Sequence, residues 1–244
     1  MPNSAAPAAQ PVERVATLGV VSFLNALPLY AGLEGRTDVL VRPDVPSRLH
    51  AMLLESAADA ALLPVVDYWR DRHRLQIISD GCIASRGETM TVRVFSRVPP
   101  DQITRLHVDG DSHTSVVLAR LLWLELYGRR LELRPWPGCQ SPDLEAVLLI
   151  GDKVVRDAPR GFGFEVDLGA AWRHLTGLPF VFAVWCGHVD HDHAQLADTL
   201  RQARDDGVAQ AAAIAERHAA RHGWPPPLAV TYLRDTMCYT LTPE

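Results

Sequence analysis

The chain has 244 residues, of which 48% are hydrophobic and 22% are charged, and its formal net charge is −5. This size and composition predict a globular protein of one large or two small domains, and a negative balance without any Lys/Arg cluster excludes a nucleic-acid surface of the usual basic kind. The four cysteines lie far apart without metal-ligand spacing, so we expect free thiols and no metal site, and no apolar run reaches the roughly 20 residues that a membrane span needs.

The first part of the chain alternates strand and helix patterns. Residues 1–13 are rich in Ala and Pro and lack the pattern of a signal peptide, so we expect a flexible tail and a cytoplasmic protein. The order after the tail, strand and helix three times over, is typical of a mostly parallel sheet covered by helices. The expected elements are strands at 17–21, 39–42 and 59–64 and helices at 26–33, 46–57 and 65–70.

The segment 20–33 contains the first polar corner. Ser22 and Asn25 follow a buried strand, at the place where an α/β sheet opens into its ligand crevice. Asn25 precedes Ala-Leu-Pro-Leu, a good position for an N-cap, and a helix start presents unpaired N–H groups that suit a carboxylate or phosphate. Local pattern leaves two interpretations open: Asn25 binds a ligand, or it only caps its own helix.

A break at residues 98–101, Val-Pro-Pro-Asp, separates two α/β halves. We expect the first lobe to comprise 14–97 and 187–244 and the second lobe 98–186, so that the chain crosses twice and a ligand cleft lies between the lobes. The further elements expected are strands at 75–78, 82–84, 90–96, 105–108, 131–134, 146–150 and 179–186, helices at 116–127 and 168–175, helices over 191–221 broken near 205–207, and a last helix and a strand near Tyr239.

Three polar corners supply the candidate binding residues. The members share short polar side chains or glycine at the ends of predicted strands, and they are Ser22 and Asn25, then Ser85, Gly87 and Thr91, then Ser112, His113, Thr114 and Ser115. Gly151 and Asp152 follow the strand at 146–150 in the same way. The alternatives are ordinary: an N-cap and turn at 112–115, a β-branched strand residue at 91, and a turn cap at 152.

Five strings in order resemble the chorismate dehydratases of the futalosine route to menaquinone. They are VSFLNALPLY, DAALLPVVDY, CIASRG with TVRVFSRVP, AVLLIGDKVV and DLGAAWRHLTGLPFVFAVWCG. The resemblance runs from about residue 19 to 187 and implies a two-lobed α/β fold of the periplasmic-binding-protein type II, with mixed, mostly parallel sheets. It also implies a cytoplasmic hydro-lyase that removes water from chorismate to give 3-[(1-carboxyvinyl)oxy]benzoate.

Two details bear on this resemblance. A sister enzyme with the same fold, the 1,4-dihydroxy-6-naphthoate synthase, has a first corner resembling SPCPNDT, whereas SFLNALP here favours the dehydratase. Many dehydratases have Ser where this chain has Thr91, which keeps the hydroxyl and adds a methyl group.

Chorismate carries two carboxylates, so its site needs clustered neutral donors if cationic side chains are lacking. We expect Asn25 and Thr91 to hold one carboxylate and the helix start at 112–115 to hold the other. The resemblance implies no metal or organic cofactor, and the partner we expect is the small dicarboxylate substrate, with neither nucleic acid nor a membrane. Three candidates remain for the group that accepts the proton: Asp152, His113 and the enolpyruvyl carboxylate of the substrate. The rival class is a non-catalytic cytoplasmic binding protein or sensor for a small carboxylate, built from the same two lobes.

Overall fold

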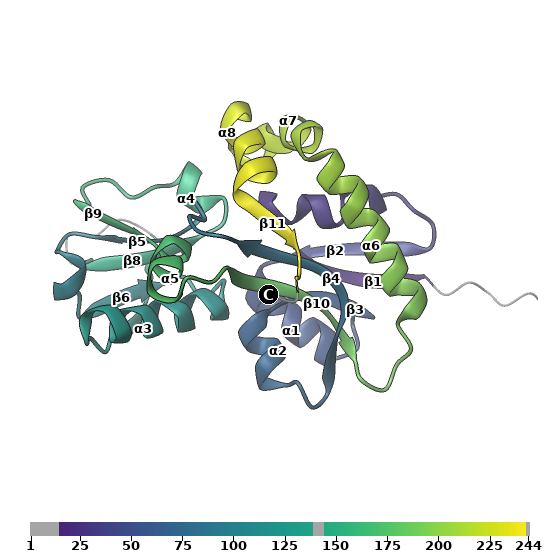
Figure 1. Ribbon diagram of the computed structural model, residues 1–244, viewed down its shortest axis with the longest axis horizontal. Helices are drawn as coiled ribbons and strands as arrows, with labels where there is room; N and C mark the ends of the chain where they lie inside the picture. The colour runs from purple at the N-terminus through teal and green to yellow at the C-terminus, as the bar shows by residue number, and fades with distance from the viewer. Residues whose placement is uncertain (1–14, 139–143, 243–244) are drawn as a thin grey trace, which may run out of the picture.

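The computed structural model describes residues 15–138 and 144–242 and contains two β-sheets, each covered by helices (Figure 1). We call the six-stranded sheet with its helices the first lobe and the five-stranded sheet with its helices the second lobe. The six strands, in the order β11-β4-β10-β3-β1-β2, are β1 (Ala16–Val21), β2 (Val39–Asp44), β3 (Ala60–Pro64), β4 (Leu75–Ser85), β10 (Phe180–His188) and β11 (Met237–Thr240). The five strands, in the order β7-β6-β8-β5-β9, are β5 (Val92–Ser96), β6 (Arg105–Val108), β7 (Glu132–Pro135), β8 (Ala146–Ile150) and β9 (Phe164–Asp167).

The helices divide between the two sheets. The first lobe carries α1 (Pro46–Leu54), α2 (Val65–Arg70), α6 (Ala194–Ala209), α7 (Ala211–His222), α8 (Pro226–Thr231), the 3-10 helices η1 (Leu24–Leu29) and η2 (Ala31–Leu33), and the π-helix η4 (Tyr232–Thr236). The second lobe carries α3 (His113–Tyr127), α4 (Lys153–Arg156), α5 (Leu168–Thr176) and the 3-10 helix η3 (Pro100–Gln102). Figure 1 shows α1 and α2 on one side of the six-stranded sheet and α6, α7 and α8 on the other.

The expected two-lobed α/β fold is confirmed, but the sheets are not mostly parallel. Among the described strands, four of the nine pairings are parallel and five are antiparallel. The reason lies in the two crossings: β4 leads the chain out of the first lobe and the adjacent β10 brings it back, so the two strands run in opposite directions. A register shift in this pairing also explains why the sequence predicted two short strands where β4 is continuous.

The lobe boundaries differ from the expected ones. The strand predicted at 90–96 is β5, which pairs with β8 and β9 in the second lobe, so the first crossing lies at residues 86–91 and not at 98. The strand predicted at 179–186 is β10, which pairs with β3 and β4 in the first lobe, so the return lies before 180. The break at 98–101 ends β5 and starts η3 inside the second lobe. The expected tail, 1–13, lies outside the described residues.

The first polar corner folds differently from the prediction. Phe23, not Asn25, is the residue that precedes the helix, and it makes no side-chain cap; Asn25 lies inside the first turn of η1. The segment forms two short 3-10 helices in place of one α-helix over 26–33 because Pro28 removes a backbone donor within it. The Asn25 side chain is therefore not used as a cap.

A close approach explains one glycine that the sequence presented as a helix breaker. Gly207 lies within α6, and a Cβ atom there would come within 1.9 Å of the Pro28 carbonyl oxygen. The glycine therefore allows α6 to pack against η1, and the break falls at Gln210 instead. This contact brings the C-terminal helices over the first polar corner.

Candidate active site

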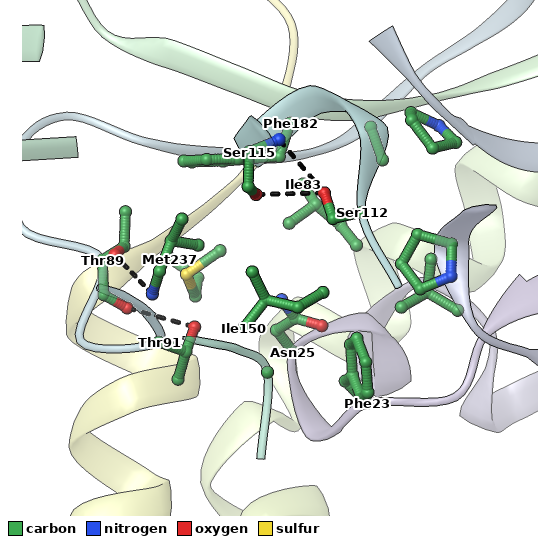
Figure 2. A pocket seen from close by; sticks show the side chains of 16 residues that line it. Phe23, Asn25, Ile83, Thr89, Thr91, Ser112, Ser115, Ile150, Phe182 and Met237 are labelled. Atoms are coloured by element: carbon green, nitrogen blue, oxygen red, sulfur yellow. Dashed lines mark hydrogen bonds between the residues drawn. The ribbon is translucent and has the colours of Figure 1, made fainter. Parts of the chain in front are cut away.

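A cavity lies at the junction of the two lobes and is lined by residues of both (Figure 2). The unfilled space in and around it is about 500 Å³, a figure that includes the solvent at its mouth. Figure 2 shows Ser112 and Ser115 on one side, Asn25 and Phe23 across from them, and Thr91 with Thr89 at the flank. The described lining residues include no charged side chain; most of them are apolar, and the polar groups among them belong to Asn25, Thr89, Thr91, Ser112 and Ser115.

Asn25 brings unused hydrogen-bonding capacity into this cavity. Its Oδ1 atom is buried and has no hydrogen-bond partner among the described residues. A buried acceptor without a donor costs free energy, on the order of 1–3 kcal/mol, unless a ligand or water satisfies it. Of the predicted residues, Asn25 therefore carries the clearest sign of a ligand.

Thr91 is buried and lies against a tyrosine from the far end of the chain. Its Oγ1 atom is 2.6 Å from the Tyr232 hydroxyl and 3.4 Å from the Thr89 carbonyl oxygen. Burial raises the pKa of the Tyr232 phenol, while hydrogen bonds with Thr91 and Asn25 lower it, so the phenol is protonated at neutral pH. No local pattern in the sequence indicated Tyr232.

Asp167 holds the crossing segment that positions Thr91. Its carboxylate accepts hydrogen bonds from the backbone N–H groups of Thr89 and Met90 at 2.9–3.0 Å and from the Thr89 hydroxyl at 2.9 Å. The same carboxylate accepts the Gly169 and Ala170 N–H groups and so caps α5. Met90 has a φ of 61°, a conformation unusual for a residue with a side chain. These contacts fix the backbone just before Thr91.

The predicted helix start at 112–115 divides its side chains between the cavity and the neighbouring lobe. Ser112 and Ser115 line the cavity; Ser112 Oγ accepts the Ser115 N–H at 3.1 Å, and its own hydroxyl donates to Ser115 Oγ at 3.0 Å. Thr114 and His113 are directed toward the first lobe. Thr114 Oγ1 accepts the Val66 N–H at 3.4 Å, and His113 Nδ1 lies 2.7 Å from an Asp67 carboxylate oxygen.

Ser85 and Gly87 do not line the cavity. The Ser85 hydroxyl donates to the Gly87 carbonyl oxygen at 3.1 Å, inside the turn that leads out of β4. Gly169 packs against this turn so closely that a Cβ there would come within 2.3 Å of the same carbonyl oxygen. Ser85 and Gly87 therefore shape the segment that crosses between the lobes, and Thr89 and Thr91 line the cavity instead.

Asp152 and Ser22 line a second cleft, whose described residues include Lys153, Arg156 and Arg221. The Asp152 carboxylate accepts hydrogen bonds from the Leu24 N–H at 3.2 and 3.3 Å, from Trp224 Nε1 at 2.8 Å and from His222 Nδ1, 2.7 Å away. All of these partners belong to the first lobe, so Asp152 ties the lobes together. The catalytic role expected for it is not supported by this placement, because its oxygens are occupied and it does not line the cavity.

Gly151, by contrast, lines the cavity as predicted. Its φ is +64°, and the Phe23 ring stands where a Cβ would lie, with the nearest ring atom 2.6 Å from that position. Phe23 borders both the cavity and the second cleft. The glycine thus permits a close contact between the lobes beside the cavity.

Histidines and carboxylates elsewhere show no metal site. Residues 15–138 and 144–242 contain no group of three or more His, Cys, Asp or Glu side chains arranged to hold an ion. Within the His-rich segment after β10, the His188 and His193 rings bond to backbone carbonyl oxygens at 2.9 Å. In the same part of the chain, no helix combines the length and apolarity that would let it cross a membrane.

Two mixed sheets in two lobes, with an uncharged cavity at their junction, define a periplasmic-binding-protein-like fold. Solved structures share it at low sequence identity. A protein of Archaeoglobus fulgidus matches with a TM-score of 0.69 and 14% identity over 92% of this chain and 88% of its own. The alkanesulfonate-binding protein of Xanthomonas axonopodis, solved with MOPS, matches with a TM-score of 0.60 and 10% identity over 93% and 86%.

The sequence places the chain within this class more narrowly. A family model described as menaquinone biosynthesis matches residues 16–244, and the chain belongs to that family. A curated chorismate dehydratase of Thermus thermophilus is 31% identical over 236 residues, covering 88% of this chain and 86% of the relative. A chorismate dehydratase of Campylobacter jejuni is 26% identical over 172 residues, covering 68% and 64%.

Proposed function

We propose that this protein is a chorismate dehydratase, a hydro-lyase that binds chorismate in the cavity between the lobes. The activity named for the two curated relatives supports the proposal, and so do the uncharged polar side chains set in the apolar lining of the cavity. The observation that carries it is the unpartnered Asn25 Oδ1 on the cavity wall, because that buried acceptor is open to a donor from a ligand. Chorismate has one such donor that does not ionise, the ring hydroxyl that is lost in the reaction.

The two carboxylates would bind at opposite sides of the cavity. The Asn25 amide nitrogen and the Thr91 hydroxyl hold one of them. The other lies at the start of α3, where the Ser115 hydroxyl and the helix N-terminus supply donors. Oriented dipoles in a site without charged walls bind an anion and do not need to reorganise as charge moves.

The reaction is an elimination that forms an aromatic ring. A proton leaves the ring carbon that bears the enolpyruvyl ether, its electron pair forms the new ring double bond, and the C–O bond to the hydroxyl breaks. The hydroxide leaves with one proton as water. Aromatisation supplies the driving force, so the protein contributes by orienting the substrate and stabilising the moving charge.

The proton acceptor in this proposal is the enolpyruvyl carboxylate of chorismate itself. Neither of the two side chains considered for this role lines the cavity: Asp152 is saturated with hydrogen bonds, and His113 pairs with Asp67. The substrate carboxylate stands beside the proton that leaves. Binding that carboxylate in the right orientation is therefore the catalytic task of the site.

The family likeness carries two wider parts of the proposal. We propose that the product enters the futalosine route to menaquinone and that the reaction takes place in the cytoplasm. Both rest on the motifs quoted above and on the family that matches residues 16–244.

A single incubation tests the activity. Purified protein is mixed with chorismate without added metal, and the aromatic product is followed by absorbance and identified by mass spectrometry. Heat-denatured protein and protein-free chorismate measure the spontaneous breakdown. Formation of 3-[(1-carboxyvinyl)oxy]benzoate above both controls supports the dehydratase, whereas saturable binding of chorismate without turnover would favour a sensor.

A further inference from the structure

Tyr232 lies behind the cavity wall and makes its polar contact with Thr91. It begins η4, its side chain is fully buried, and its ring stacks on Trp224 with centroids 4.7 Å apart and planes at 17°. The Thr91 Oγ1 atom, 2.6 Å from the phenol oxygen, lies on the wall of the cavity itself. Tyr232 therefore reaches the ligand space only through another residue.

The hydrogens at this contact can be assigned by counting donors and acceptors. Asn25 Oδ1 has no partner and so does not accept from the phenol; among the described residues, the acceptor within hydrogen-bond distance of the Tyr232 phenol is Thr91 Oγ1. The phenol hydrogen then goes to Thr91 Oγ1, the partner at 2.6 Å. The Thr91 hydroxyl has only a long alternative, the Thr89 carbonyl at 3.4 Å, so its hydrogen is available to the cavity.

This order of hydrogen bonds determines what the cavity presents to a ligand. Asn25 presents an acceptor and Thr91 presents a donor, and the orientation of the Thr91 hydroxyl depends on the phenol behind it. We propose that Tyr232 is a positioning residue for the elimination, which aligns the Thr91 hydroxyl on one carboxylate of the substrate. The inference rests on the proposed function, since it concerns the same cavity.

A second buried tyrosine provides a matched control. Tyr239 lies on β11, and its hydroxyl is buried without a partner among the described residues. Tyr239→Phe removes the same atom from the same part of the first lobe but breaks no described hydrogen bond. Tyr232→Phe keeps the ring that stacks on Trp224 and removes only the atom on which the proposal depends.

The test compares steady-state turnover of chorismate in the two variants. We expect Tyr232→Phe to lower kcat about 10- to 100-fold, less than the loss for a donor that touches the reacting atoms, with KM changed by less than about threefold. Tyr239→Phe stays within about twofold of the unsubstituted protein in both constants. Equal kcat values in the two variants would overturn the positioning role.

A double-substitution cycle separates positioning from a general structural effect. In a Thr91→Val background the phenol has lost its partner, so adding Tyr232→Phe lowers kcat by no more than about twofold. Thr91→Ser keeps the hydroxyl, and there Tyr232→Phe costs the same factor as in the unsubstituted protein. If the factor is unchanged in the Thr91→Val background, the two residues act independently and the proposal is wrong.

A spectroscopic measurement covers the case in which Tyr232→Phe does not fold. 3-Fluorotyrosine placed at 232 keeps the hydroxyl, and its fluorine resonance reports on the phenol hydrogen bond. We expect the resonance to shift on Thr91→Val and on addition of the reaction product, and an unmoved resonance overturns the proposal. If the unsubstituted protein forms no aromatic product, the proposed function fails first; if it does form product and Tyr232→Phe matches it, only the role of Tyr232 fails.

Discussion

Two polar clusters lie at the lobe junction, both bordering Phe23, and they differ in how completely their hydrogen bonds are satisfied. Around Asp152, one carboxylate accepts bonds from a backbone N–H, an indole and an imidazole nitrogen of the opposite lobe. Around Asn25, an acceptor is buried with no donor among the described residues, and the neighbouring hydroxyls of Thr91 and Ser115 face a cavity. The first cluster is complete within the described residues, and the second leaves hydrogen-bonding capacity open to the cavity.

This difference in hydrogen-bond satisfaction can be used to assign roles to buried polar residues at the same junction. A charged residue that follows a strand looks more catalytic in the sequence than a neutral amide does. The hydrogen bonds in the structure reverse this ranking of carboxylate above amide, because a carboxylate whose oxygens already accept hydrogen bonds has no capacity left for a substrate. Substitutions in the two clusters are therefore expected to have opposite effects on turnover and on stability.

The largest expected effect is on turnover at the unsaturated cluster. Asn25→Ala removes the acceptor and the amide that orient the substrate, so kcat falls about 10²- to 10³-fold. The free energy of unfolding changes by less than about 1 kcal/mol, because Oδ1 has no partner to lose. Steady-state kinetics and urea denaturation measure the two quantities. Near-normal turnover would remove Asn25 from the mechanism.

The reverse pattern is expected at the saturated cluster. Asp152→Ala leaves three first-lobe donors without their acceptor and lowers the free energy of unfolding by about 3 kcal/mol. The folded fraction retains more activity than Asn25→Ala does. Asp157→Ala, which removes only an exposed pair with Arg156, serves as the control and stays within about 0.5 kcal/mol. If both aspartate variants have the same stability, Asp152 is not a tie between the lobes.

A smaller effect is expected at the contact between the clusters. Gly151→Ala places a Cβ 2.6 Å from the Phe23 ring at a φ of +64°, so we expect a loss of about 1–3 kcal/mol in unfolding free energy and a raised KM for chorismate. Gly163→Ala is the control, because its Cβ would meet nothing within 4 Å. Thermal unfolding compares the two variants, and equal melting temperatures would contradict the close contact.

The smallest effect concerns two buried thiols that belong to neither cluster. Burial raises the pKa of Cys82 and of Cys186 to about 12. Their preference for the protonated form is fully present below pH 9, the pKa of an unfolded thiol, and the resulting stability is lost as the pH rises from 9 toward 12. At pH 8 we therefore expect no alkylation of either thiol in the folded protein and full alkylation in urea, measured by peptide mass spectrometry.

Much of the fold could be predicted from local pattern. The bounds of β8 and α2 agree with the sequence expectation because β8 is a short buried run closed by glycine and α2 is preceded by proline. The four-residue elements α4 and β9 were missed, since neither is long enough to show a period. The lobe boundaries were wrong because a proline pair ends a strand equally well within a lobe and between lobes.

The site was predictable where it follows strand ends and not where it depends on distant contacts. Asn25, Thr91, Ser112, Ser115 and Gly151 were all expected, and all line the cavity. Tyr232 was missed because it is separated from Thr91 by 141 positions. The burial that saturates Asp152 likewise comes from His222 and Trp224, which no spacing rule connects to it.

The order of the strands along the chain determines when each lobe can fold during synthesis on the ribosome. All strands of the second lobe come from one continuous stretch, whereas the six-stranded sheet combines β1 to β4 with β10 and β11. The second lobe can therefore assemble before β10 and β11 have been made, but the first lobe must wait for both strands. Because Tyr232 and Met237 also follow the second lobe in the chain, the cavity is complete only after β11 has been made, and shorter nascent chains carry no competent site.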